Sequence, residues 1–161
     1  MTSTFDVILV GGGLASSFVA AALRHAHPGL RLAVVERNAG LGGNHTWCFH
    51  DSDVPDDTTR AWLAPFVAKR WPRWETRFPG GSRMFDAGYN AITTGSLQAA
   101  VASVLATPGS ALVSGSAAVS VGARRVALDD GRVLEAALVL DGRGPRPEEA
   151  SAPGAGFQKL V

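Results

Sequence analysis

The sequence lacks the features that mark several classes of protein. Its 161 residues include a single cysteine, Cys48, so no internal disulfide forms and a reducing compartment is expected. No apolar run reaches the ~20 residues that span a bilayer, and Val7 to Val10 is too short and too early for a secretory signal. A formal net charge of only +1 gives no electrostatic basis for binding nucleic acid. These absences predict a cytoplasmic protein and leave contact with a membrane surface open.

What is present indicates a globular chain. The hydrophobic fraction is 46% and the charged fraction 18%, and the length is enough for one domain with a core. The last residues, Gly154 to Val161, have the pattern of a glycine-rich loop that leads into a new strand. We therefore expect a truncated chain, a fragment of a longer protein. A short frayed tail is the alternative.

The N-terminal part, residues 5–36, has the pattern of a β-α-β unit. Phe5–Val10 and Leu30–Val35 are short apolar runs, which predict two buried parallel strands. Between them, Leu14–Ala26 predicts a helix that ends at Pro28-Gly29, with a helical apolar face of Leu14, Phe18, Ala21 and Ala22. The predicted fold class is therefore α/β, a Rossmann-like fold with a parallel sheet and crossover helices.

The turn in this unit has the chemistry of a dinucleotide site. Gly11 allows a tight turn, Gly13 lets the backbone approach a pyrophosphate, and Ser16 stands where a third small residue is needed for helix packing. The helix N-terminus supplies free N–H groups for phosphates. Glu36 closes the second strand, where an acid accepts hydrogen bonds from a ribose. The alternative is an ordinary glycine turn, with Glu36 a coincidence.

The later segments continue an α/β pattern and add a small β-meander. We expect a long functional loop over residues 39–55, an insertion over 56–93, and a helix over 94–105 with Thr94 as its N-cap. The insertion and the C-terminal part are expected to hold the following smaller elements: a helix over 57–69 broken at Pro65, a short strand within 71–79, strands at 111–113, 117–121 and 125–128, a hairpin turn at 129–131 with a return over 133–135, a buried strand at 137–140, and a new segment from 145 to 161.

Two runs after Glu36 carry a resemblance to known families. Gly42-Gly43 lies where the large FAD-binding family of hydroxylases, reductases and amine oxidases has a second glycine pair along the cofactor. Gly42–His50, which reads Gly-Gly-Asn-His-Thr-Trp-Cys-Phe-His, resembles a hallmark of bacterial lycopene β-cyclases. Further segments resemble the same family in the same order: Ile8–Ala15, Trp71-Pro72, Arg77–Pro79, Gly88-Tyr89, Ile92-Thr93, Leu140–Gly144 and Gly156–Gln158. The resemblance covers nearly the whole chain.

The resemblance implies an activity and a cofactor. Members of this family cyclise the linear ends of lycopene to β-ionone rings without net redox change, using reduced FAD with NAD(P)H as the electron source. Their acidic cluster and C-terminal flavin motif would lie beyond Val161, so the substrate part would be absent and no catalytic residue is identifiable here. The residues expected to contact FAD are Gly11, Gly13, Leu14 and Ala15 at the phosphates, Glu36 at the ribose, Gly43, Asn44 and His45 further along, and Asp141 and Gly142 close by.

Several residues have more than one interpretation. His45 and Trp47 line the flavin or substrate cavity, or they pack the loop against the sheet. Cys48 is expected to be a small buried hydrophobe, and no metal site is expected from the neighbouring histidines. Lys69–Trp74 pairs cations with aromatics, which favours either peripheral contact with the inner membrane or a solvated edge with inward tryptophans.

Two other functions compete with the cyclase. One is another flavoenzyme, a hydroxylase or a prenyl-chain reductase, and the other is a non-catalytic dinucleotide-binding module. A linear carotenoid is the expected partner of the cyclase. The sequence predicts no oligomeric state.

Overall fold

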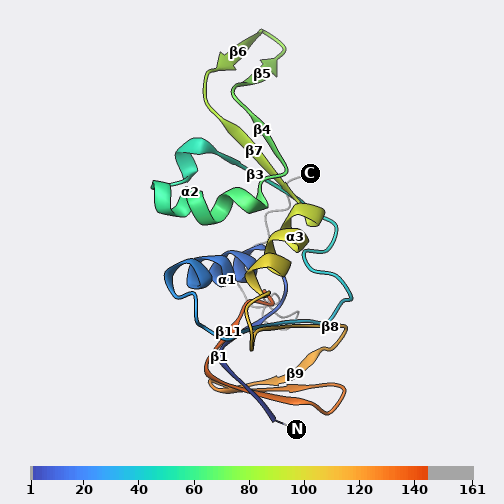
Figure 1. Ribbon diagram of the computed structural model, residues 1–161. Helices are drawn as coiled ribbons and strands as arrows, with labels where there is room; N and C mark the ends of the chain where they lie inside the picture. The colour runs from blue at the N-terminus through green and yellow to red at the C-terminus, as the bar shows by residue number, and fades with distance from the viewer. Residues whose placement is uncertain (1, 145–161) are drawn as a thin grey trace.

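The computed structural model describes residues 2–144, and the segment expected over 145–161 lies outside them. The described chain forms a six-stranded sheet, a layer of helices on one face of it, and smaller sheets beyond the helices (Figure 1). The six-stranded sheet lies at one end of the molecule, and a two-stranded hairpin projects at the other end.

The main sheet has the order β8-β2-β1-β11-β10-β9. Its four parallel strands are β1 (Thr2–Val10), β2 (Leu32–Glu36), β8 (Ala111–Ser114) and β11 (Val133–Asp141). The chain leaves β1 on one side for β2 and β8, and returns on its other side as β11. This reversal leaves a crevice at the carboxyl end of β1, where doubly wound sheets bind their ligands.

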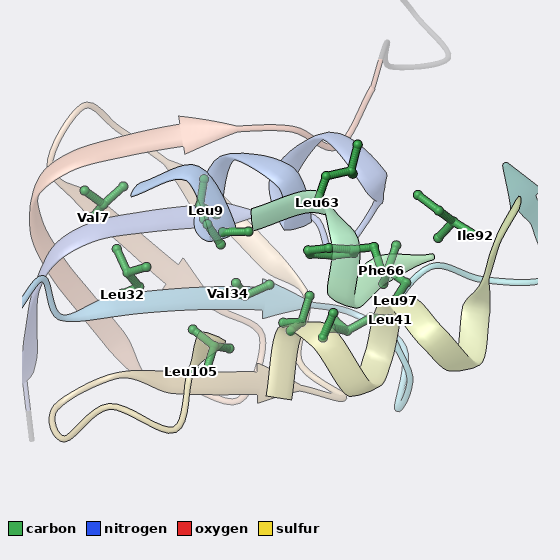
Figure 2. Packing of buried hydrophobic residues seen from close by; sticks show 14 of the residues in the cluster. Val7, Leu9, Leu32, Val34, Leu41, Leu63, Phe66, Ile92, Leu97 and Leu105 are labelled. Atoms are coloured by element: carbon green, nitrogen blue, oxygen red, sulfur yellow. The ribbon is translucent and has the colours of Figure 1, made fainter. Parts of the chain in front are cut away.

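Apolar residues cover both faces of the central strands. Val7, Leu9, Leu32 and Val34 point toward the helices and pack with Leu97, as Figure 2 shows from close by. The opposite face packs against the meander through a second cluster that includes Ile8, Val10, Ala33, Val35 and Val126. Strand β2 is therefore buried on both faces, as its apolar run predicts.

Helix α1 (Leu14–Ala26) begins and ends where the sequence predicts, but its buried face is rotated. The residues that pack against the sheet are small, namely Ser16, Ser17, Ala20 and Ala21, whereas Leu14 and Phe18 are only partly buried. Small side chains let the helix lie close to the strands. Phe18 instead turns toward the next helix, where its ring meets Trp62 at 5.7 Å and Phe66 at 5.3 Å, both edge to face.

The loop expected over 39–55 is shorter than predicted. Strand β3 (Thr46–His50) and the 3₁₀ turn η1 (Asp51–Asp53) occupy its second half. Strand β3 pairs with β7 (Tyr89–Thr93), which also pairs with β4 (Lys69–Trp71). Neither β3 nor β7 shows a marked alternation of apolar and polar residues in the sequence. Each forms a strand because the other supplies its hydrogen-bond partners.

The rest of the insertion follows the predicted order with different bounds. Helix α2 (Asp57–Leu63) stops before Pro65, which lies in the 3₁₀ turn η2 (Ala64–Phe66), so the predicted break is confirmed and the extension to residue 69 is wrong. The short strand expected within 71–79 is β5 (Trp74–Phe78), which forms a hairpin with β6 (Gly81–Phe85).

Helix α3 (Thr94–Val104) is capped by Thr93 and not by Thr94 as predicted. The Thr93 hydroxyl accepts a hydrogen bond from the Ser96 N–H at 3.2 Å, and the Ser96 hydroxyl accepts one from the Thr93 N–H at 3.0 Å. Because Thr93 caps the helix, the Thr94 side chain is available for the contacts with the loop before β3 that are described below.

The meander is formed by β9 (Ala118–Val121) and β10 (Arg125–Leu128), followed by the predicted turn and β11. Two strands were expected over 133–140, and the structure has one continuous strand there. The C-terminal half of β11 was predicted to be buried. That prediction is wrong, since Leu138 is 47% and Leu140 37% exposed. They pair in register with Val7 and Leu9, so they share the helix-facing side of the sheet, where no described element covers them.

Asp51 holds the three-stranded sheet together. Its carboxylate accepts a hydrogen bond from Asn90 Nδ2 of β7 at 2.8 Å, forms an ion pair with Arg70 of β4, and lies 4.0 Å from the Arg60 guanidinium of α2. The Asn90 hydrogen bond first, and then Arg70, lower the pKa of Asp51 from its ordinary 3.8. A lowered carboxyl pKa adds stability that is complete above the unfolded-state pKa and is lost as the pH falls through the folded-state pKa.

We predict that Asp51→Asn lowers the free energy of unfolding by about 1–3 kcal/mol at pH 7, because the buried Asn90 and two arginines lose a charged partner. The deficit should shrink as the pH falls below about 4, where Asp51 is protonated first in the unfolded chain, and it should vanish once the pH passes the lowered folded-state pKa. Denaturant titrations between pH 3 and pH 7 measure both effects. Asp57→Asn is the matched control, since Asp57 is fully exposed although it lies 3.7 Å from Arg60. Equal losses of unfolding free energy in the two variants would contradict the role of Asp51 in holding the three-stranded sheet together.

Candidate dinucleotide site

A cavity of about 510 Å³ lies at the carboxyl ends of β1, β2 and β11, in the crevice where the strand order reverses. Its walls come from the turn between β1 and α1, the end of β2, the loop before β3, the start of β9 and the residues after β11. Segments far apart in the sequence therefore share one site, and each can be followed from its contacts.

The glycines of the first turn differ in what surrounds them. A Cβ on Gly11 would lie 3.1 Å from the backbone of Gly142, and Gly11 has a φ of 96° that favours glycine. A Cβ on Gly12 would collide with the Leu41 side chain. A Cβ on Gly13 would meet nothing within 4 Å, so this position faces open space in the cavity. Gly11 and Gly12 are required for packing, and Gly13 leaves room for a ligand.

Helix α1 presents an N-terminus without a side-chain cap to this space. Gly13 is its N-cap residue, and within residues 2–144 no side chain caps it and no acidic residue lies in its first turn. The first N–H groups of a helix have no partner inside the helix, and they carry partial positive charge. The turn therefore offers backbone donors to an anion.

Ser16 sets the distance between α1 and the end of β11. It is 4% exposed, and a Cβ on Gly142 would come 2.5 Å from its hydroxyl oxygen. The Gly142 N–H donates to the carbonyl oxygen of Val10 at 2.8 Å, which fixes the end of β11 beside β1. The serine at the third position of the motif is thus accommodated by a glycine on the neighbouring strand.

Glu36 is held at the mouth of the cavity by three hydrogen bonds. Its Oε2 accepts the N–H of Gly12 at 2.8 Å, and its Oε1 accepts the backbone N–H and the side-chain amide of Asn38 at 2.9 Å and 2.7 Å. An ionised carboxylate has about four lone-pair sites. Glu36 is therefore oriented by the protein, and about one of its four lone-pair sites stays available to a ligand hydroxyl.

The loop before β3 is fixed by helix α3. The Thr94 hydroxyl donates to the carbonyl oxygen of Gly43 at 2.8 Å, and the Gln98 amide donates to that of Leu41 at 3.0 Å. The Gly42 N–H donates to the Gly12 carbonyl at 2.9 Å, which joins the two glycine turns. Gly42 and Gly43 both have positive φ, 77° and 59°, a region that favours glycine.

Arg143 lines the wall of the cavity that is formed by the start of β9 and the residues after β11. Its guanidinium pairs with Asp141 at 2.7 Å and donates to the carbonyl oxygen of Ala118 at 2.9 Å. The hydrogen bond that Arg143 donates to Asp141 raises the pKa of Arg143 further above its already high value, so this side chain is a permanent cation at the cavity wall. Asp141 therefore orients Arg143 and does not itself line the cavity.

The structure brings most of the predicted residues together. The expected residues that line the cavity are Gly11, Gly13, Leu14, Glu36, Gly43, His45 and Gly142. Ala15, Asn44 and Asp141 are not part of its lining; Ala15 and Asn44 are exposed. Gly42 and Arg143, which the sequence placed near the cofactor, also line the cavity, whereas Gly12, Asn38, Ala117 and Ala118 are lining residues that the sequence did not single out. Of these four, only Gly12 carried a local signal that could have identified it.

Trp47 both lines the cavity and packs against the core, whereas His45 is exposed and only lines the cavity. Both line the cavity, with ring centroids 5.5 Å apart. Trp47 also packs on the helix-side core, and its ring lies 3.1 Å from where a Gly42 Cβ would stand. A second, mostly apolar cavity of about 280 Å³ adjoins the first, since Leu14 and Trp47 line both.

Cys48 is exposed, so its prediction as a buried hydrophobe is wrong. It lies on β3, an edge strand of the three-stranded sheet, which leaves its outward face open. Among residues 2–144, no group of three or more His, Cys, Asp or Glu side chains is arranged to hold a metal ion. No helix of the described chain is both long and apolar enough to cross a bilayer.

Comparison with solved structures supports the architecture. The chain is similar to a probable FAD-dependent monooxygenase of Pseudomonas aeruginosa, with a TM-score of 0.63 and 18% identity over 85% of this chain and 42% of that one. This identity is informative about the fold alone. The predicted Rossmann-like α/β fold with a parallel-rich sheet is confirmed.

Comparison of sequences identifies the family. The chain is 37% identical over 161 residues to the lycopene β-cyclase of Pantoea ananas, covering all of this chain and 41% of the relative. It is 39% identical over 149 residues to that of Pseudescherichia vulneris, covering 92% and 38%. The chain thus spans about two fifths of the length of these relatives. The model of the family described as lycopene cyclase protein matches residues 6–161, and the chain belongs to this family.

Proposed function

We propose that this chain is the FAD-binding part of a lycopene β-cyclase, which converts the linear ends of lycopene to β-ionone rings. One observation carries the proposal. His45 and Trp47, from the run most specific to the family, line the same cavity as the dinucleotide motif. A peripheral enzyme at the cytoplasmic face of the inner membrane would have access to such a substrate.

The residues of the cavity fit a flavin dinucleotide. Backbone N–H groups at the start of α1, beside the open space at Gly13, would hold the diphosphate. Glu36 would accept hydrogen bonds from the adenosine ribose, and Asn38 keeps its carboxylate in place. Gly43 and His45 lie along the wall that leads away from Glu36, where the rest of the cofactor would pass.

Cyclisation requires no net oxidation. A proton added to the terminal alkene creates a tertiary carbocation, the neighbouring double bond closes the ring, and a proton is lost again. Reduced FAD, kept reduced by NAD(P)H, would supply negative charge near this cation when bound. In this proposal the residues of the chain bind the cofactor and orient it toward the substrate. Leu14 and Trp47 line both cavities and form an apolar boundary between them, and the aromatic face of Trp47 is suited to a nearby cation.

We predict that Gly13→Asp separates binding from stability. An aspartate at this N-cap would accept the free N–H groups of α1 and stabilise the helix, while its charge occupies the space proposed for the diphosphate. FAD binding should weaken by at least about tenfold with no loss of thermal stability. Calorimetric titration of the apoprotein from the whole reading frame measures the first effect, and a melting curve the second.

Gly29→Asp is the matched control for this variant, because a Cβ there also meets nothing within 4 Å and the position lies beyond the far end of α1. It should bind FAD as the unmodified protein does. Unchanged FAD affinity in Gly13→Asp would overturn the proposed position of the diphosphate.

We predict that cells that accumulate lycopene produce β-carotene or γ-carotene when they express the protein from its whole reading frame. Chromatography of the pigments detects the products. Gly13→Asp should abolish conversion, and Gly29→Asp should preserve it. Unchanged lycopene in cells with well-expressed, flavin-loaded protein would reject the cyclase. Oxygenated products would favour a hydroxylase of the same fold.

A further inference from the structure

Strands β5 and β6 form a hairpin that is isolated from both larger sheets. They pair only with each other among the described strands, and Figure 1 shows them projecting beyond the three-stranded sheet, at the end away from β9. A two-stranded hairpin is marginally stable alone in water. This hairpin is anchored by stacking of Trp74 on Phe85, with centroids 4.1 Å apart, and by contacts of Trp74 with His50 and Tyr89 at 4.9 Å and 6.4 Å.

Large apolar side chains stay exposed on this projection. Phe78 is 67% exposed beside the turn, and Met84 is 52% exposed on β6. Trp71 of β4, at the base of the hairpin, is 40% exposed, so it is not tucked inward. The register places Phe78 and Met84 on opposite faces of the hairpin. Phe78 is the most exposed of these side chains, and the register places it on the same face of the hairpin as Arg83.

Positive charge is concentrated in the same segment. Residues 69–85, which we call the basic hairpin, hold the five cations Lys69, Arg70, Arg73, Arg77 and Arg83 and the single carboxylate of Glu75. Their net charge is +4 in a chain of formal net charge +1, so the other residues together carry −3. The charge is thus segregated at one end of the molecule.

Three of the five cations form no ion pair within the described part of the chain. Arg70 pairs with Asp51, and Arg77 with Glu75 at 2.8 Å. Lys69, Arg73 and Arg83 form no ion pair among residues 2–144, and Arg83 instead lies over the Phe85 ring at 4.7 Å. Exposed aromatics among unpaired arginines suit a boundary that is anionic on one side and apolar on the other.

We propose that the basic hairpin docks on the surface of an anionic lipid bilayer, with Phe78 inserted between headgroups and the arginines against lipid phosphates. The inference rests on the proposed function, because lycopene is a hydrocarbon that dissolves in bilayers and must enter the enzyme from there. It also explains why the projecting strands are arginine-rich and aromatic, a composition that water alone does not favour.

Vesicle sedimentation tests this proposal on the protein from its whole reading frame. The vesicles contain phosphatidylcholine alone or with about a third phosphatidylglycerol, and no carotenoid. Binding should require phosphatidylglycerol and weaken with salt. Arg73→Gln with Arg83→Gln should reduce binding roughly 30-fold, since each cation near an anionic surface contributes about fivefold. Phe78→Ser should reduce it by at least about tenfold.

Each variant has a matched control at the opposite end of the fold. Arg124→Gln with Arg125→Gln removes two exposed cations next to β10, and Val119→Ser replaces an exposed residue of β9, itself 65% exposed. These controls should bind vesicles as the unmodified protein does. Equal losses in the controls would reduce the effect to net charge and overturn the proposal.

Other outcomes are also decisive. Failure of the folded protein to bind either vesicle overturns the proposal. So does a fall in melting temperature of the hairpin variants with unchanged vesicle binding, which would mean that the hairpin packs on another part of the protein. Because the readout contains no carotenoid, hairpin-dependent binding without cyclase activity would uphold the docking surface and reject the proposed substrate.

Discussion

The close approach of three chain segments at Gly11 and Gly12 is the constraint on which the site depends. The backbone after β11 lies against Gly11, while the Leu41 side chain and Glu36 lie against Gly12. Any side chain at Gly12 would displace Leu41, and Leu41 is buried among the helix-side core residues. The same contact therefore joins the core, the carboxylate and the loop before β3. Gly13 is free of it, and so faces the cavity.

The three-stranded sheet shares no strand with the six-stranded sheet. Hydrogen bonds from helix α3 connect it to the loop that lies against Gly12. Helix α3 holds the carbonyl oxygens of Leu41 and Gly43, and its own position is fixed by Leu97 and Val101 in the core. Strand β3 follows directly from that loop and pairs with β7, which leads into α3. The loop before β3 and helix α3 therefore join the dinucleotide cavity to the three-stranded sheet, and Trp47 of β3 itself lines the cavity.

The cavity and the basic hairpin lie at opposite ends of the molecule. The cavity lies against the six-stranded sheet, and the basic hairpin lies at the far end with the three-stranded sheet between them. Asp51 connects α2, β4 and β7 in this middle layer, and the rings of His50, Trp74 and Tyr89 continue it to the hairpin.

The sequence by itself determined the β-α-β unit, the bounds of α1, the dinucleotide motif with Glu36, and the family. These are local signals, since apolar period, glycine turns and a specific run need no distant partner. Tertiary structure alone decided that Gly12 is the crowded glycine, that Thr93 caps α3, and that residues 46–50 form a strand. It also left Leu138 and Leu140 exposed and Cys48 outward. The Thr93 cap has a local partner in Ser96, and all the others depend on a segment remote in sequence, whose position no local pattern specifies.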